Sequence, residues 1–444
     1  MKENINFESK RSKKQEKIEV QSKAERKLSS FQPAVERSRW DEIRKKIAGA
    51  ILAASILMGE GGGVKAENVS QVLERQPTVE YVEKTLEQDR TFREKLKDAD
   101  RMYANLDETS LEEIRKMYRL LEEINNSKEF KSLPYYEQAE LTHREAYSKL
   151  AFNRQWFRES FQKFTSQDAE GLYMNFKEIN SLFLRAIEME LNREGELSPK
   201  RNRSINGLIE SGRTMAYQAI RLSVERPDLG EVINRILTES NDPVEKAFEI
   251  DNRPRYVGNG FYIFPREGKE QFARLVVGLA KYSGDIPKNV PDDEAVRHIG
   301  GAHYDVATQV LPWVNAILSG KIIGNQYDYA LIDKLVRDGI IICKDNRCSK
   351  GKVETLTFSS PNEMVFTHEA AHDVHAKHPE YLELARKMYN SLSPEDRKLF
   401  DDFMRMQNPN LSEDNKMKEF FAYAHTSYPS GNWKDYARKV LGIR

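Results

Sequence analysis

The amino-acid sequence predicts a mainly α-helical protein with a small sheet, in which an N-terminal helical domain precedes an α+β domain. Apolar residues recur at helical spacing through residues 67–250. The first alternating, strand-like pattern, in residues 256–264, follows Arg253-Pro254. Only 16 prolines occur in 444 residues, which leaves room for long helices.

The composition is typical of a soluble protein with sizeable hydrophobic cores. Lysine and arginine together number 70, as do aspartate and glutamate, while 39% of the residues are hydrophobic and 32% are charged. Balanced charge gives no overall field that would attract a nucleic acid or an anionic membrane. We therefore expect no nucleic-acid partner and no stable membrane span, and the sequence indicates no oligomeric state.

The first 66 residues differ from the rest of the chain. Residues 1–46 hold 14 lysines and arginines against 8 acidic residues and few apolar ones, which predicts disorder. Residues 47–58 are too few to span a bilayer, but with a small-x-small site at 64–66 they match a signal peptide over 47–66. The alternative is a short amphipathic helix that begins near Trp40. Export would make the protein secreted or part of the cell envelope, and otherwise it is cytoplasmic.

Residues 67–250 form the predicted helical domain. Ser110 opens one helix, in which Ile114, Met117 and Leu121 recur at helical spacing. Its basic clusters are interleaved with acids, which favours a solvated surface over a nucleic-acid groove. His143 is predicted to be an ordinary surface residue.

Residues 251–444 form the predicted α+β domain. Strands are expected within 256–264, at 340–342 as a short buried strand of three isoleucines, and at 353–358. Helices are expected around 267–282 and 303–319, the second kinked or divided at Pro312. A further helix is expected after Ser393, with Met404 and Met406 in its core-facing pattern.

Cys343 and Cys348 are the only cysteines. Their spacing suits a small loop closed by a disulfide if the chain is exported. Free thiols in a cytosolic protein are the alternative.

The strongest functional signal is a His-Glu-x-x-His motif at His368, Glu369 and His372. Residues 360–363 supply a helix start before it, with Ser360 as the expected N-cap of a capping box. The two histidines are four residues apart in that helix, so both imidazoles project from one face. This spacing allows both rings to bind one Zn²⁺ ion at about 2.0–2.1 Å.

Glu369 is the expected general base. A bound zinc ion lowers the pKa of a water molecule to about 7 and polarises a peptide carbonyl. The carboxylate that follows the first histidine can then take the proton from the attacking water.

A catalytic zinc site takes a third protein ligand, for which two residues compete. His378 follows His368 by ten positions, and Pro379 pushes it out of the helical region. Glu419 lies in an aromatic, alanine-rich helix that Ser412 can cap. A carboxylate buried there needs a partner, and zinc would be that partner. We favour Glu419 and keep His378 as the alternative.

Aromatic and histidine side chains near the motif extend the predicted site. Tyr423 shares a helix face with Glu419, so it is expected to orient that ligand or to reach the substrate. Either Tyr423 or Tyr428 is expected to stabilise the oxyanion. His298 and His303 flank a Gly-Gly pair, and a loop and helix-cap role is predicted for them, with an approach to the metal as the alternative.

The Glu419-Phe420-Phe421-Ala422 sequence, some fifty residues after His-Glu-x-x-His, resembles the gluzincin arrangement of the anthrax lethal factor catalytic domain and its relatives. It is also similar to small bacterial gluzincins of the Mlc-titration-factor kind. The resemblance implies a zincin-like fold over about the last ninety residues, with the two motif histidines and Glu419 as zinc ligands. It departs from the lethal-factor pattern at Tyr423, where relatives have a second Glu, and at Ser412, where they have a catalytic Tyr.

The sequence thus predicts a zinc-dependent endopeptidase that acts on a peptide or protein substrate. A sheet beside the zinc helix would align an extended peptide by main-chain hydrogen bonds. The alternative function is that of a helical interaction module, such as a secreted effector, whose zinc site is structural or degenerate.

Overall fold

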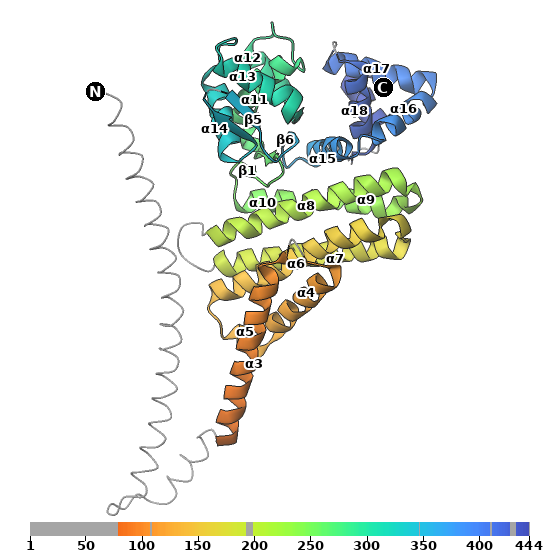
Figure 1. Cartoon of the computed structure of the whole chain (residues 1–444). Helices are drawn as coiled ribbons and strands as arrows, with labels where there is room; N and C mark the ends of the chain where they lie inside the picture. The colour runs from red at the N-terminus through yellow and green to blue at the C-terminus, as the bar shows by residue number, and fades with distance from the viewer. Residues whose placement is uncertain are drawn as a thin grey trace, which may run out of the picture. The chain divides into compact units, whose positions relative to one another are not determined.

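The computed structural model describes residues 79–106, 109–191, 199–345, 347–408, 411–426 and 432–443. Residues 91–444 pack as one compact unit (Figure 1). The predicted class, mainly helical with a small sheet, is confirmed. The predictions for residues 1–46 and 47–66 lie outside the described residues. Within the described ranges, no helix has both the length and the apolar character that crossing a bilayer requires.

The described residues before residue 251 form helices and contain no strand. Ser110 caps its second helix as predicted, because its side chain and that of Glu113 form a capping box. The helices are α3 (Val79–Tyr103), α4 (Leu111–Asn126), α5 (Lys128–Lys131), α6 (Tyr135–Ser160), α7 (Ser166–Leu191), α8 (Pro199–Glu225), α9 (Gly230–Glu239) and α10 (Asp242–Ile250).

The described residues after residue 251 contain all the described strands together with nine α-helices. The strands are β1 (Arg255–Tyr256), β2 (Phe261–Ile263), β3 (Ala302–Asp305), β4 (Ile341–Lys344), β5 (Arg347–Lys350) and β6 (Thr355–Ser359). The helices are α11 (Lys269–Ser283), α12 (Asp292–His298), α13 (Leu311–Leu318), α14 (Gln326–Arg337), α15 (Glu363–Lys377), α16 (Tyr381–Ser391), α17 (Pro394–Gln407), α18 (Glu413–Ala424) and α19 (Trp433–Leu441).

Four strands form a mixed sheet in the order β1-β2-β6-β3. β2 runs parallel to β6, whereas β3 is antiparallel to β6 and forms one edge of the sheet. Phe261 and Ile263 enter the core that contains α15, while Tyr262 enters the core that contains α11. This alternation is the two-residue period of a strand, and it places the sheet between two helical layers.

One hydrophobic core continues across residue 250. α8 packs against α15, and buried residues from α6 to α10 belong to the same cluster as those of α15 to α19. Phe366 of α15 is fully buried in this cluster and contacts Phe261 of β2 edge-on, with ring centroids 6.2 Å apart. The helical layer therefore supports the underside of the helix that carries the His-Glu-x-x-His motif.

The predicted helix over 303–319 is wrong in its first part. Residues 302–305 form β3, in which His303 pairs with Thr357 of β6. A π-helical turn, η5 (Val306–Val310), follows, and α13 then begins with Pro312 in its first turn. Pairing with a distant strand overrides the helical spacing of the apolar residues there.

The N-cap of α15 is Asn362 and not Ser360 as predicted. β6 extends to Ser359, whose carbonyl accepts a hydrogen bond from the Phe264 amide at 2.9 Å. Ser360 therefore lies in the connection between β6 and α15, and the helix begins two residues later than expected. The N-caps of α17 and α18, Ser393 and Ser412, are as predicted.

Three burial predictions are also wrong. His143 is only 7% exposed, and its Nδ1 lies 3.1 Å from Ser204 Oγ. Met406 is 51% exposed although Met404 is buried, and Ile342 is 60% exposed on its hairpin. Spacing along one helix or strand does not show which neighbouring element covers which face, and this accounts for all three.

Cys343 and Cys348 form a disulfide across the β4–β5 hairpin, which is the alternative predicted for an exported chain. The two residues are direct partners in the antiparallel register. Asn315 of α13 binds Cys348 at both main-chain groups, with distances of 2.8 and 3.1 Å, and so attaches the hairpin to the helices.

Candidate metal centre

Two histidines of α15 form one side of the centre. His368 and His372 lie one turn apart, and their Nε2 atoms are 3.1 Å from each other. Both side chains are largely buried, with exposed fractions of 13% and 9%. The α-helical spacing brings the two imidazoles together on one face, which is the arrangement that the sequence predicts.

Glu419 of α18 forms the other side. Its Oε2 lies 3.3 Å from Nε2 of His368, and its Oε1 lies 3.4 Å from Nε2 of His372. α18 packs directly against α15, so a carboxylate far along the chain reaches the histidine pair. A search of the described residues for three or more His, Cys, Asp or Glu side chains that could hold one metal ion finds this group.

The distances fit a tetrahedral zinc site. With bonds of about 2.0–2.1 Å to zinc, atoms at two corners of a tetrahedron are about 3.3–3.4 Å apart. The two Nε2 atoms are 3.1 Å apart, and they lie 3.3 and 3.4 Å from the two different carboxylate oxygens of Glu419, so each separation is close to this value. Two imidazole nitrogens and one carboxylate oxygen are also a donor set that zinc prefers, and they leave a fourth corner open.

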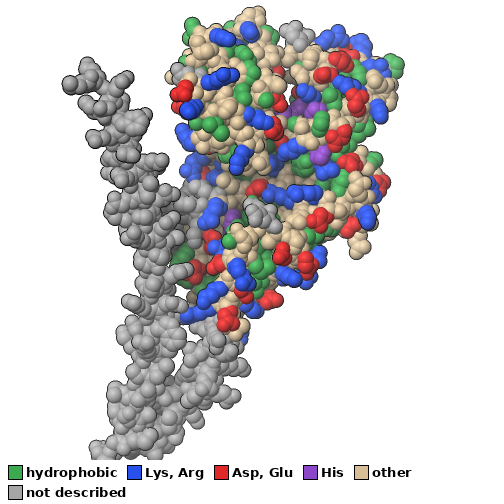
Figure 2. Space-filling model, in the orientation of Figure 1, with side chains coloured by type: hydrophobic (Ala, Val, Ile, Leu, Met, Phe, Trp, Pro, Cys, Tyr) green, Lys and Arg blue, Asp and Glu red, His purple; other side chains and the backbone are tan. Residues whose placement is uncertain are grey.

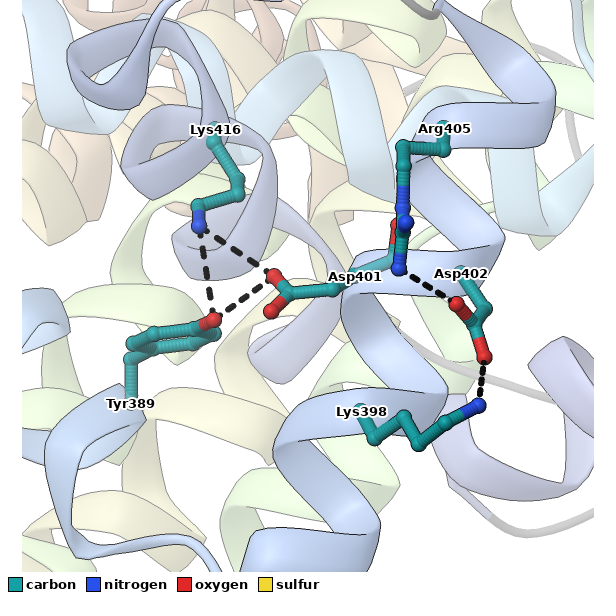
Figure 3. Close-up of polar contacts among 6 residues, drawn as sticks. All are labelled: Tyr389, Lys398, Asp401, Asp402, Arg405 and Lys416. Carbon is teal, nitrogen blue, oxygen red and sulfur yellow. Dashed lines mark hydrogen bonds and ion pairs between the residues drawn. The ribbon is translucent and has the colours of Figure 1, made fainter.

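A polar network fixes the helix that carries Glu419. Figure 3 shows Lys416 of α18 donating hydrogen bonds to Asp401 of α17 and to Tyr389 of α16, at 3.2 and 3.4 Å. Tyr389 in turn donates to Asp401 at 2.6 Å. The network ties three helices together within one turn of the third ligand.

Glu369 is buried beside His368, His372 and Glu419 without a complete set of partners. It is 5% exposed, and its Oε2 has no hydrogen-bond partner among the described residues. Burial raises the pKa of Glu369 to about 8; the neighbouring His372 opposes this rise, and Glu419 adds to it. A bound cation would lower the pKa again. A buried carboxyl group without a partner is costly, which is typical of a group retained for chemistry.

The position of Glu369 requires a glycine at the start of the edge strand. A Cβ atom on Gly301 would lie 2.2 Å from Oε1 of Glu369 and 2.8 Å from its Cδ. Gly301 immediately precedes β3, so the strand passes over the carboxyl group because no side chain intervenes. This packing role of Gly301 has no local signal in the sequence.

The three ligand side chains shift one another's pKa values. Burial lowers the pKa of His368, although Glu419 acts in the opposite direction. Burial would also lower the pKa of His372, but the Glu419 carboxylate outweighs it and the pKa is raised. Burial would raise the pKa of Glu419, but the two imidazoles hold it well below its usual range. Glu419 is therefore ionised at neutral pH and available as an anionic ligand.

His303 belongs to the centre, contrary to the predicted loop and helix-cap role. Its ring stacks on His372, with centroids 5.6 Å apart and planes inclined by 25°. Its Nδ1 lies 2.9 Å from Oγ1 of Thr357 in the paired strand. Burial lowers the pKa of His303 to about 3, so the ring is neutral. His298 ends α12, and its side chain lies outside the described ones.

Tyr423 lies against the first histidine. Its ring centroid is 4.5 Å from that of His368, and its ring also packs against Phe403 at 5.1 Å. It lines the same cavity as the ligands. Tyr428, the other tyrosine considered for the oxyanion, lies outside the described residues.

His378, the alternative third ligand, is not part of the cluster. It ends α15, where its Nε2 lies 2.8 Å from the Tyr217 hydroxyl of α8. Its Nδ1 lies 3.2 Å from Oε1 of Glu380. Both ring nitrogens therefore have protein partners away from the two motif histidines.

The ligands open into a cavity of about 850 Å³. β3, α15 and α18 contribute its walls, together with the residues that follow α11. Figure 2 shows histidine side chains beside a hollow in this part of the surface. The volume is within the range of about 300–1,000 Å³ that is usual for ligand sites.

Comparison of the chain with known protein families, curated proteins and solved structures finds no match.

Proposed function

We propose that this protein is a zinc-dependent peptidase with a gluzincin-type centre, in which His368, His372 and Glu419 hold the metal. The observation that carries the proposal is the convergence of three side chains from two helices: the two histidine Nε2 atoms are 3.1 Å apart, and they lie 3.3 and 3.4 Å from the two carboxylate oxygens of Glu419. Each separation is close to the distance between two corners of a zinc tetrahedron. A buried carboxyl group in the position of a general base stands next to them.

Each residue has a defined role in this proposal. Zinc would supply Lewis acidity, which polarises a carbonyl group and acidifies water. Glu369 takes the proton from the attacking water and passes it to the leaving amine. Tyr423, whose ring lies against His368 and lines the cavity, orients the site or donates a hydrogen bond to the carbonyl oxygen as its charge develops.

The free edge of the sheet supports a peptide as the substrate. The Val306 amide donates to the Glu354 carbonyl across the ladder at 2.8 Å. Hydrogen-bonded and non-hydrogen-bonded residue pairs alternate along an antiparallel ladder. His303 and Thr357 are therefore a non-hydrogen-bonded pair, and the main-chain N–H and C=O of His303 point toward the free edge of β3. An extended peptide can add to this edge as a further strand and lie along the cavity.

A purely structural zinc site is less well supported. Structural sites usually close the metal with four protein ligands, whereas three side chains form the cluster among the described residues. A structural site also does not explain why Glu369 is buried although its Oε2 has no hydrogen-bond partner among the described residues, which costs stability. For these reasons we favour the enzyme over the interaction module.

The test compares the wild-type chain with Glu369→Gln, each loaded with zinc. Both proteins are expected to bind one zinc ion. Turnover of a peptide library, followed by mass spectrometry, should fall by roughly 10²–10⁴-fold in the variant, which is the usual contribution of a general base. Chelation should abolish wild-type turnover and added zinc should restore it. Full turnover by the Glu369→Gln protein would refute the mechanism.

A further inference from the structure

The cavity beside the metal ligands is lined by groups of both charges. Tyr304 donates a hydrogen bond to the Asp285 carboxyl group, and these two residues interact electrostatically with Glu369 and Glu419, respectively. The rings of His303 and His375 both interact with the charge of Lys418.

The cavity's remaining acidic side chains already have protein partners. Glu354 forms an ion pair with Lys350. Asp305 caps the turn after β3, because its Oδ1 accepts a hydrogen bond from the Thr308 amide at 2.7 Å. The Asp285 carboxylate accepts a hydrogen bond from the Ser283 hydroxyl at 2.7 Å in addition to the one from Tyr304. None of these groups therefore needs a cationic ligand.

Lys418 differs from them. Among the described residues it is the only lysine or arginine that lines the cavity. It donates a hydrogen bond to Oδ1 of Asn415 at 3.3 Å, and no carboxylate of the described residues forms an ion pair with it. Lys416, two positions earlier, is paired with both Asp401 and Glu413. The ammonium group of Lys418 thus has donors left for a ligand.

His375 provides a second observation, and its ring interacts with the charge of Lys418. It lines the cavity and is only 7% exposed, yet its Nε2 is buried without a hydrogen-bond partner among the described residues. Buried polar groups nearly always have hydrogen-bond partners in a folded protein. This part of the cavity wall therefore carries a cation without an ion pair and a ring nitrogen without a hydrogen-bond partner.

We propose that Lys418 is a specificity-determining residue that binds a carboxylate of the peptide substrate. This inference rests on the proposed peptidase function and narrows its substrate class. The carboxylate comes from an acidic side chain near the cleaved bond or from the C-terminus of the peptide. A hydrogen-bonded ion pair in a partly desolvated site favours such a substrate over a neutral one by about tenfold.

The test measures binding, using the zinc-loaded full chain with Glu369→Gln so that peptides stay intact. Three fluorescein-labelled decapeptide pools of uncharged residues are compared by fluorescence anisotropy: one with a free C-terminus, one amidated, and one amidated with an internal glutamate. The first or the third pool should bind about tenfold more tightly than the second. Which of the two does so identifies the source of the carboxylate.

Two further variants in this background assign the effect. Lys418→Met should remove the difference between the pools, and zinc content measured alongside shows that the centre is intact. Lys387→Met is the matched control, because Lys387 is exposed on α16 and does not line the cavity; the difference should persist there. Lys418→Glu should favour a pool with an internal lysine.

Equal binding of the three pools, absence of binding, or a difference that survives Lys418→Met would overturn the inference. These outcomes are separate from failure of the proposed function, which is read from turnover by the wild-type protein. A wild-type enzyme that cleaves peptides without any carboxylate preference leaves the peptidase assignment standing and removes only the role of Lys418.

Discussion

Two buried glutamates differ in their polar partners. One lies in the helical region, and the other lies beside His368, His372 and Glu419. Glu145 of α6 is 4% exposed, accepts a hydrogen bond from Asn125 at 2.5 Å and pairs with Lys149 at 3.1 Å. Glu369 of α15 is 5% exposed, but its Oε2 has no hydrogen-bond partner in the described part of the chain. The two side chains are equally buried, but the Glu145 carboxylate is paired with a lysine, whereas one oxygen of Glu369 lacks a hydrogen-bond partner.

Under the proposed function, this difference separates a buried glutamate that stabilises the fold from one that takes part in catalysis. A buried ion pair that is complete holds helices in a specific arrangement, and removing one partner is destabilising. An incomplete polar group costs stability and persists where binding or catalysis needs it. In the proposed function, the helical layer is a scaffold and the centre between α15 and α18 carries the reactive groups.

The largest expected effect concerns the third ligand. Glu419→Ala should weaken zinc binding by roughly a hundredfold or more, because a three-ligand site loses one donor and the charge that offsets the metal. His378→Ala, the matched control, should retain one zinc per chain, since His378 contacts Tyr217 and Glu380 instead. Zinc competition with a chromogenic chelator measures both. Zinc loss in the His378 variant alone would overturn the ligand assignment.

The next effect tests the two glutamates directly, in metal-free protein. Glu145→Gln should lower the free energy of unfolding by about 2 kcal/mol, because it breaks a buried pair and leaves Lys149 with only the half-exposed Glu178. Glu369→Gln should cause no decrease, since Oε2 loses no partner. Urea denaturation of both variants provides the values. A larger loss for Glu369→Gln than for Glu145→Gln would reverse the comparison.

A smaller effect concerns pH. Burial lowers the pKa of His143 to about 4, whereas the unfolded chain binds this proton near pH 6.5. Stability from the neutral ring is fully present above pH 6.5 and is lost as the pH falls from 6.5 toward 4. In metal-free His143→Gln, the loss of unfolding free energy between pH 6.5 and 4.5 should shrink by about 1–2 kcal/mol. An unchanged pH dependence would show that His143 is not held neutral.

The smallest effect concerns the network in Figure 3. Lys416→Met removes the ties from α18 to Asp401 and Tyr389. Zinc affinity should fall by about threefold, less than the tenfold or more expected for a residue that hydrogen-bonds a ligand directly. Lys398→Met is the control, because Lys398 is exposed and pairs only with Asp402 in the figure. Equal zinc affinity in both variants would remove the positioning role of Lys416.

Much of the helical framework could be predicted because its signals are local. A capping serine, an i,i+4 pair and an apolar stripe lie within one or two turns of one another. Ser110, Ser393 and Ser412 therefore mark their helix starts as predicted. The pairing of His368 with His372 on one face follows from the same short-range geometry.

The tertiary structure decided what depends on distant segments. Strand pairing places His303 opposite Thr357, and the backbone at Gly301 packs against Glu369. Packing of α18 on α15 brings Glu419, and not His378, to the two motif histidines. The sequence by itself determined the helical class and two imidazoles on one helix face, since those follow from the 3.6-residue period. The third donor, the edge strand and the cavity wall were fixed only by packing between elements, because contacts across a core leave no periodic trace along the chain.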